Sequence, residues 1–180
     1  MNTKITSLAI VLIFSGLSAV AQVKKGNVLA GGSMSLQSAK ETGITSTAFE
    51  FSPGFGYFFA DKFAAGVKVG YTSLKVKDMD AITDGMIGPF VRYYLLDADN
   101  KVNLMVDGHF LFGSAKMGSE SVNQNMLGAM AGPVFFLNKH TALEVLLGYS
   151  STKIQDFTDR TNTVSMSVGF QIHLGNGKGK

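Results

Sequence analysis

The chain has 180 residues, which is enough for one domain, and its 16 Lys and Arg outnumber its 13 Asp and Glu by only three charges. Without a basic stripe to neutralise phosphates, nucleic acid is not expected as a partner. The chain has no Cys, which excludes disulfides and a lipidated N-terminal cysteine. Apolar residues make up 46% of the chain, yet beyond its first segment no apolar run reaches the roughly 18 residues of a membrane helix.

The first segment, 1–21, has the pattern of a secretory signal peptide. Lys4 is followed by the apolar run "ITSLAIVLIFSGLSAVA", which ends in the small-x-small triplet Ala19-Val20-Ala21. We therefore expect cleavage between Ala21 and Gln22. The alternative is a membrane anchor helix, but the apolar run is short for a span and its end suits a peptidase.

Beyond this segment, apolar and polar residues alternate with a period of two, which indicates β-strands. In the stretch 49–57, one face carries Phe49, Phe51, Pro53, Phe55 and Tyr57, and the other carries Glu50, Ser52, Gly54 and Gly56. The alternation restarts at Phe63, after a polar break. The pattern predicts a hairpin of two long strands with a tight turn at Asp61.

Six further stretches alternate in the same way. They are 28–36, 87–94, 103–112, 127–135, 143–150 and 164–174. With the first hairpin they make eight strands of roughly ten to fourteen residues each, which is long for a soluble sheet and typical of a barrel that spans a membrane.

One sequence pattern occurs three times. It reads "SPGFGYFFADKFAAGVKVGY" at 52–71, "GPFVRYYLLDADNKVNLMVDGHF" at 88–110 and "GPVFFLNKHTALEVLLGY" at 132–149. Each copy has a small residue, a proline, an aromatic cluster, a polar break and an alternating run. We interpret each copy as one periplasmic turn with its two membrane-crossing strands. Because proline cannot donate a ladder hydrogen bond, we expect a bulge or a missed bond at Pro53, Pro89 and Pro133.

The charges of the strands fall on the small, polar face. They are Glu50, Lys68, Arg92, Asp107 and Glu144. The narrow interior of an eight-stranded barrel suits small residues with a few paired charges, whereas bulky apolar rows suit lipid. On the lipid face, Lys or Arg would cost about 2–4 kcal/mol at mid-bilayer. We therefore expect these five charges to line the lumen as a paired network, with Arg92 and Asp107 as partners; the alternative is the lining of a conduit.

This assignment of faces also predicts how substitutions act. Val67→Arg and Val145→Arg should impair membrane assembly because both valines would point to lipid. Gly66→Ser, on the lumen side, should be mild.

The aromatic residues gather at two levels. The residues that flank the tight turns are Tyr57, Phe58, Phe59, Phe63, Tyr93, Tyr94, Phe135 and Phe136, and those near the far ends of the return strands are Tyr71, Phe112 and Tyr149. Tyr94 also falls on the interior row with Arg92. The predicted girdle residues are Tyr57, Phe63, Tyr71, Tyr93, Phe112, Phe135 and Tyr149. About ten residues separate the turn from the far aromatic, which at roughly 3.3 Å per residue and 45° of tilt is on the order of 23 Å of depth. The spacing fits an apolar band of about 25 Å between two girdles.

With these motifs, the chain resembles the small outer-membrane β-barrel proteins of the OmpA/OmpX/OmpW type, most closely the short versions of Bacteroidetes-type Gram-negative bacteria. The spaced motif P-x-x-x-Y…D-K…G-x-x-x-G-Y carries this resemblance. It implies an all-β, eight-stranded antiparallel up-and-down transmembrane β-barrel over 22–175 and a short periplasmic tail at 176–180. The chain departs from the family at its end, "GFQIHLGNGKGK", where Leu174 or Phe170 would have to serve as the C-terminal assembly signal.

The same resemblance implies a location in the outer membrane, both termini in the periplasm, and four extracellular loops around 38–43, 77–84, 116–123 and 153–161. The partners it implies are outer-membrane lipid, lipopolysaccharide and the barrel assembly machinery, and the barrel is expected to be monomeric.

No catalytic, cofactor or metal site is expected. Asp78, Asp80 and Asp84 lack the Gly and the closing Glu of an EF-hand, so a solvated loop is the better interpretation. His109, His140 and His173 do not cluster, and none lies at the extracellular rim, where a barrel enzyme needs its base.

Three functions remain open. The first is a structural or surface-interaction barrel with a side-chain-filled lumen. The second is an OmpW-like porin or conduit for small or apolar solutes. The third is a soluble ligand-binding barrel.

Overall fold

The computed structural model describes residues 23–41, 44–76, 81–118, 120–155 and 157–175. The predicted signal peptide and its cleavage point, Asp78 and Asp80, and the tail at 176–180 lie outside the described residues. Within the described part of the chain, no helix is long and apolar enough to cross a membrane.

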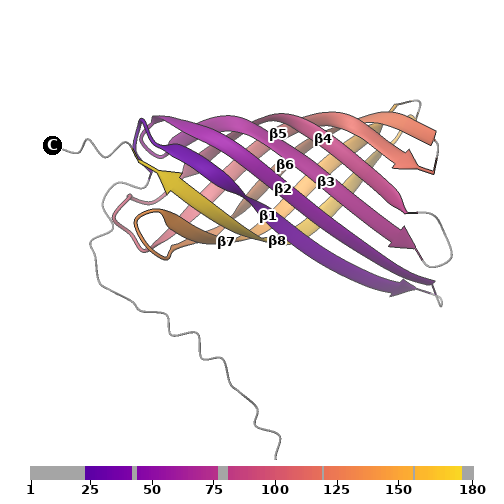
Figure 1. Cartoon of the computed structure of the whole chain (residues 1–180), viewed down its shortest axis with the longest axis horizontal. Helices are drawn as coiled ribbons and strands as arrows, with labels where there is room; N and C mark the ends of the chain where they lie inside the picture. The colour runs from indigo at the N-terminus through magenta and orange to yellow at the C-terminus, as the bar shows by residue number, and fades with distance from the viewer. Residues whose placement is uncertain (1–22, 42–43, 77–80, 119, 156, 176–180) are drawn as a thin grey trace, which may run out of the picture.

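Eight antiparallel strands close into one barrel in which each strand pairs with its neighbours in the sequence (Figure 1). The strands are β1 (Val28–Glu41), β2 (Ile44–Ala60), β3 (Phe63–Val76), β4 (Ile82–Tyr94), β5 (Val102–Met117), β6 (Glu120–Phe136), β7 (Thr141–Ile154) and β8 (Arg160–Leu174). The predicted eight-stranded up-and-down barrel is confirmed. The β2–β3, β4–β5 and β6–β7 turns and Val23 lie at one end, called here the turn end, and the other four connections lie at the loop end.

Alternation decides which side chains face outward. Phe55 is 60% exposed and Leu147 is 64% exposed on the outer surface, whereas the neighbouring positions turn inward and are buried. Phe170 and Leu174 also face outward. Because successive side chains of a strand point to opposite faces, the apolar surface is continuous and the polar row is enclosed.

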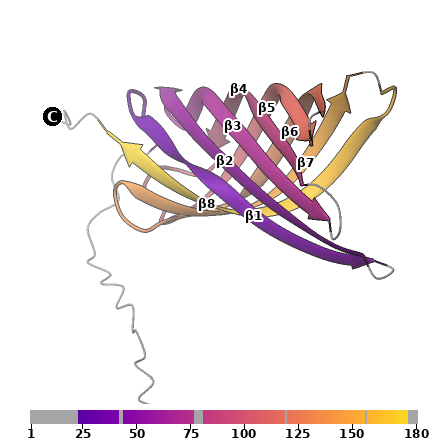
Figure 2. The same ribbon diagram turned by 45° about the vertical axis from the view of Figure 1, so that its right-hand side comes forward.

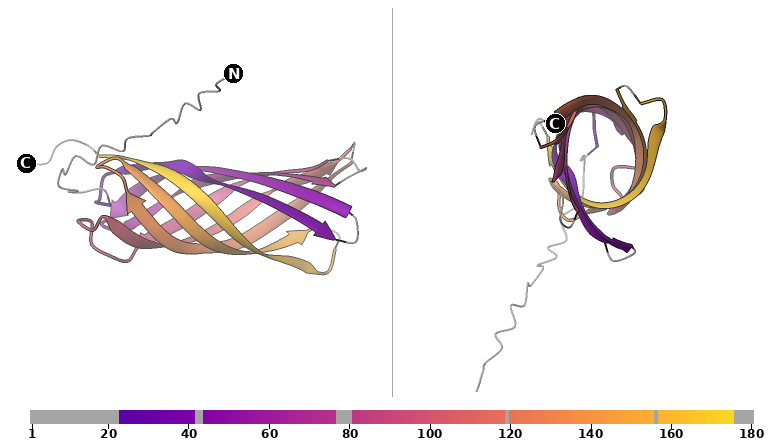
Figure 3. Two further views of the ribbon diagram at one scale, coloured as in Figure 1. Left: turned by 90° about the horizontal axis from the view of Figure 1, so that it is seen from below. Right: turned by 90° about the vertical axis from the view of Figure 1, so that its right-hand side faces the viewer.

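The barrel is closed along only part of its height. The pairing of β1 with β8 runs from Val28 opposite Leu174 to Met34 opposite Val168, and stops there. Beyond Met34, β1 still pairs with β2 up to Glu41. Figures 2 and 3 show the outer part of β1 leaving the ring of strands. The segments 35–41 and 160–167 therefore form an open seam toward the loop end.

The prolines interrupt one ladder each without a shift of register. Three strand pairs are missing at these prolines, and the same register resumes beyond each gap. The gaps lie at Pro53 between β2 and β3, at Pro89 between β4 and β5, and at Pro133 between β6 and β7. The expected missed bonds are therefore present, whereas the one register shift recorded between β2 and β3 lies at Phe58 and Ala60.

The small residue before each proline makes the interruption possible. A Cβ on Gly88 would lie 1.9 Å from the Phe110 carbonyl oxygen, and one on Gly132 would lie 2.0 Å from the Val145 carbonyl oxygen. At Ser52 the solution differs: its hydroxyl donates to the Val69 carbonyl at 3.1 Å, opposite Pro53. The hydroxyl supplies the donor that the proline lacks.

We expect Ser52→Ala to lower the free energy of unfolding by about 1 kcal/mol, because the Val69 carbonyl loses this donor. The measurement is equilibrium urea unfolding of the barrel in lipid vesicles. Ser167→Ala is the matched control, since the buried Ser167 hydroxyl has no hydrogen-bond partner within the described residues. Equal losses in both variants would contradict the assigned role of Ser52.

The expectation that Gly66→Ser is mild is wrong. Gly66 faces Gly56 across β2 and β3, and a Cβ at Gly66 would lie 2.0 Å from the Phe55 carbonyl oxygen and 2.5 Å from the Gly56 Cα. The backbone of the neighbouring strand β2, and not the space in the lumen, limits the size of the residue at position 66.

Gly66→Ser should therefore destabilise the barrel, whereas Gly54→Ser should be tolerated. Gly54 faces the same lumen, but the nearest atom to its Cβ would be the Val67 carbonyl oxygen at 3.5 Å, an ordinary contact. Heat-modifiability on gels and urea midpoints of the two variants give the comparison. Similar midpoints would show that the strands at Gly66 can separate without cost.

Candidate functional site: the charge cluster and aromatic plug of the lumen

Four strands send charged side chains into one cluster inside the barrel. Lys68 comes from β3, Arg92 from β4, Asp107 from β5 and Glu144 from β7, and each of the four residues is at most 7% exposed. Lys68 Nζ lies 2.7 Å from Asp107 Oδ1. We call these four residues the charge cluster.

Arg92 holds the charge cluster together. Its Nε lies 3.2 Å from Asp107 Oδ2 on the adjacent strand, where the two residues are register partners. Its Nη1 crosses the lumen to Glu144 Oε1, 2.8 Å away. Two cations therefore face two carboxylates, so the cluster has no net charge with its lysine and carboxylates ionised. This balance matters because an unpaired buried charge costs several kcal/mol.

Neighbouring side chains make further hydrogen bonds and ring contacts with the charge cluster. Gln171 Nε2 donates to Glu144 Oε2 at 3.3 Å, and His109 Nδ1 is hydrogen-bonded to Asp107 Oδ1 at 3.1 Å. The Phe90 ring lies 5.3 Å from Lys68 Nζ and 5.8 Å from Arg92 Cζ, within the range of cation–π contacts. The cavity that remains beside the cluster has a volume of about 10 Å³, roughly the space of one water centre.

The structure brings together four of the five charges predicted to line the lumen. Glu50 also faces inward, but it lies nearer the loop end, where the Ser35 hydroxyl lies 3.4 Å from its Oε2. No recorded ion pair of the described residues joins it to the charge cluster. Arg92 and Asp107 pair as the strand order suggested; the contact from Arg92 to Glu144 joins strands that are not neighbours.

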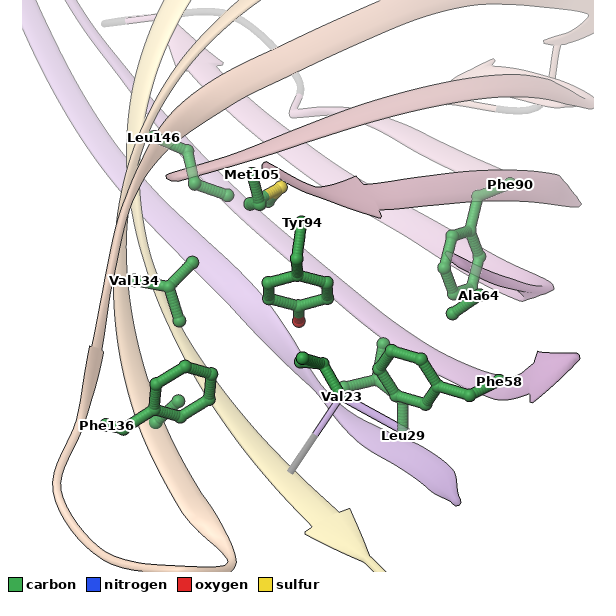
Figure 4. Packing of buried hydrophobic residues seen from close by; sticks show 11 residues of the cluster. Val23, Leu29, Phe58, Ala64, Phe90, Tyr94, Met105, Val134, Phe136 and Leu146 are labelled. Atoms are coloured by element: carbon green, nitrogen blue, oxygen red, sulfur yellow. The ribbon is translucent and has the colours of Figure 1, made fainter. Parts of the chain in front are cut away.

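Between the charge cluster and the turn end, aromatic rings fill the lumen (Figure 4). The rings of Phe58, Tyr94, Phe136 and His173 contact one another with centroids 5.6–6.4 Å apart. Tyr94 Oη and His173 Nε2 are hydrogen-bonded at 3.3 Å. Leu29, Met105, Val134 and Leu146 pack around them. We call the four rings the aromatic plug.

The first described residues cover the aromatic plug at the turn end. Val23 is 1% exposed and belongs to the same apolar cluster. Its carbonyl accepts a hydrogen bond from the Lys62 amide at 2.7 Å, and the Gly26 amide donates to the Phe58 carbonyl at 2.8 Å. This segment is thereby fixed across the turn end.

At the same end, an exposed ion pair links two turns. Lys62, which has a φ of 66°, pairs with Asp97. This hydrogen bond raises the pKa of Lys62 and lowers the pKa of Asp97. Both side chains meet solvent, so the pair contributes little to stability.

Two of the plug residues were expected in the wrong layer. Phe58 and Phe136 were grouped with the aromatics at the turns, but both are buried in the lumen. Tyr94 is buried in the lumen, as its place on the same face as Arg92 predicted. Their sequence neighbours Tyr57, Tyr93 and Phe135 do face outward, as do Tyr71, Phe112 and Tyr149, whereas Phe63 is half-buried. Adjacent residues on a strand point to opposite faces, so the doublets themselves carried the signal.

Asp84 was expected in an extracellular loop, but it lies within β4 and lines the lumen. The remaining polar residues bring no metal site together: within the described part of the chain, no three His, Asp or Glu side chains are placed to hold an ion. His109 bonds to the charge cluster, His173 belongs to the aromatic plug, and His140 is exposed in a turn.

Comparison with known proteins identifies the barrel. The family model described as "Outer membrane protein beta-barrel domain" matches residues 59–178. The chain belongs to this family. It is therefore an outer-membrane β-barrel protein, and the resemblance to small outer-membrane barrels is confirmed. A comparison with curated proteins gave no significant match.

Solved structures share the fold of this outer-membrane barrel. Neisserial surface protein A (NspA) is similar with a TM-score of 0.60 and 15% identity, over 82% of this chain and 97% of its own. The outer membrane protein OprG from Pseudomonas aeruginosa is similar with a TM-score of 0.55 and 15% identity, over 84% of this chain and 97% of its own. At this identity the likeness shows the fold alone.

For this outer-membrane barrel we expect Arg92→Ala to cost about 3–5 kcal/mol of unfolding free energy, because it leaves Glu144 and part of Asp107 buried without their cation. Urea unfolding in lipid vesicles measures the loss. The matched control, Lys62→Ala, removes a cation from an exposed pair and should leave the stability nearly unchanged. A small loss in Arg92→Ala would mean that the charge cluster does not hold the barrel together.

Proposed function

We propose that this protein is an integral outer-membrane β-barrel with a structural or surface-interaction role and a side-chain-filled lumen. One observation carries the proposal: the charge cluster and the aromatic plug occupy successive layers of the lumen and leave about 10 Å³ beside the cluster. A water-filled path needs continuous space, and an eight-stranded barrel has an interior that side chains just fill. The apolar exterior disfavours a soluble ligand-binding barrel.

For its orientation, we infer that the turn end faces the periplasm and the loop end faces outward. Short turns and both ends of the described chain lie together at the turn end (Figure 1). Outer-membrane barrels have short periplasmic turns and longer extracellular loops. In this orientation the aromatic plug and Val23 seal the periplasmic side.

The outer rim supports an interaction with lipopolysaccharide. Four exposed cations stand at outward positions near the loop end of their strands; they are Lys75, Lys116, Lys153 and Arg160. The Arg160 guanidinium is held by the Ser151 hydroxyl and carbonyl, both at 2.9 Å. Cations that ring a barrel just beyond its apolar band suit the phosphates of anionic lipid.

The alternative is a conduit for small or apolar solutes. The feature that favours it is the emptier outer half of the lumen, which holds a cavity of about 430 Å³. The difference between the two functions lies in the inner layers, where a conduit would need the charge cluster to open.

Purified protein in planar lipid bilayers should show no steady channels. Because the charge cluster and the aromatic plug each block the lumen, Arg92→Ala alone should also stay closed, while Arg92→Ala combined with Tyr94→Ala and Phe136→Ala should conduct if the variant folds. The gel shift of the unheated protein checks folding. Steady openings of the unmodified protein that Arg92→Ala leaves unchanged would replace this proposal with the conduit.

A further inference from the structure

The outer half of the lumen is a cup with a closed floor. Its cavity of about 430 Å³ lies on the loop-end side of the charge cluster and is lined by residues that include Glu50, Thr72, Asp84, His109 and Gln124. This volume is in the range of sites that enclose small molecules. We call this cavity the outer cup.

The charged groups of the outer cup are of one sign. Glu50 and Asp84 supply two carboxylates, while no Lys or Arg is found among the described residues that line it. His109, the only histidine of the lining, is hydrogen-bonded through Nδ1 to Asp107 in the floor, and its ring lies over Gly128. Lys68 and Arg92, the nearest lumen cations of the charge cluster, are engaged with Asp107 and Glu144.

Strand register places the two carboxylates in one row across the wall. Glu50 on β2 is opposite Thr72 on β3, and Thr72 is opposite Asp84 on β4. Neighbouring strands are about 4.8 Å apart, so the two acidic residues are separated by roughly 10 Å along this row. Thr72, between them, adds a hydroxyl to the same row.

These acidic residues lack the partners that the charge cluster provides to its own. Within the described residues, Asp84 Oδ1 and Gln124 Nε2 are buried without a hydrogen-bond partner, and Gln124 is only 7% exposed. The Gln124 side chain interacts with the Asp84 carboxylate, yet Asp84 Oδ1, an acceptor, has no recorded donor. Glu50 has only the Ser35 hydroxyl at 3.4 Å among its recorded hydrogen bonds. Burial of a polar group without a partner is unfavourable, so a ligand that supplies a donor to Asp84 Oδ1 is favoured here.

We propose that the outer cup binds a small organic cation, an amine or diamine, whose ammonium groups are received by Glu50 and Asp84. Ammonium supplies the donor that Asp84 Oδ1 lacks and adds a charged donor to Glu50, whose recorded hydrogen bond comes from the Ser35 hydroxyl at 3.4 Å. The alkyl part of such a ligand would contact Met126, Met130 and Ile154 in the same lining. Two carboxylates in one row match a ligand with two ammonium groups. The closed floor makes the outer cup a binding site whether or not the barrel conducts.

The test is isothermal titration of the refolded barrel in non-ionic detergent with 1,4-diaminobutane, with 1,4-butanediol as the uncharged ligand of similar length. We expect saturable binding of the diamine and none of the diol. Glu50→Gln and Asp84→Asn should each weaken binding at least tenfold. Asp97→Asn, which removes an exposed carboxylate at the turn end, should leave binding unchanged.

Each variant is first checked for folding by its gel shift. Absence of saturable binding to the unmodified protein would overturn the proposal. It would also be overturned by diamine binding that neither Glu50→Gln nor Asp84→Asn weakens, because the ammonium groups would then lie elsewhere. Channel recordings are independent of this result, so the outer cup and the closed lumen can fail separately.

Discussion

The narrow interior of an eight-stranded barrel is the constraint on which the rest of this structure depends. All inward side chains share a space that they must just fill, so bulk and charge have to be arranged in layers. From the turn end, the aromatic plug comes first, then the charge cluster, then the outer cup. The charge cluster tolerates burial because Arg92 reaches both carboxylates. Two of the large inward side chains lie over a glycine of the wall: the Phe90 ring over Gly56, and His109 over Gly128.

The three-fold repeat now has a physical explanation at the level of single residues. In each copy a small residue precedes the proline, because the facing strand approaches closely or, at Ser52, because a hydroxyl replaces the missing donor. In each copy an aromatic doublet follows, and it sends one ring to the lipid side and the next ring into the aromatic plug. One short sequence pattern thus provides the strand pairing at the proline, an outward aromatic residue and a ring of the aromatic plug. This is why the pattern recurs in each turn-end hairpin.

The period-two pattern was sufficient to predict the strands, their order and the inward face of the five charges assigned to the lumen, since each of these depends on residues near one another in sequence. What meets across the lumen was not predictable in the same way. The contact from Arg92 to Glu144 depends on how far the strands are staggered around the barrel, which no local pattern specifies. Asp84 was placed in a loop because strand ends are poorly marked in sequence, and Gly66 was misjudged because its limit is the backbone of the facing strand.

The open seam between β1 and β8 connects these layers to the membrane. Backbone groups without partners cost several kcal/mol each in hydrocarbon, and the seam carries the apolar outward residues Val164 and Met166. The register that ends at Met34 and Val168 would, if continued, bring position 36 opposite Met166. Completing the seam would therefore continue the existing register. Because the outer cup lies on this side of the charge cluster, closure of the seam would reshape its wall, while the floor built by Arg92 stays fixed by pairing that is already complete.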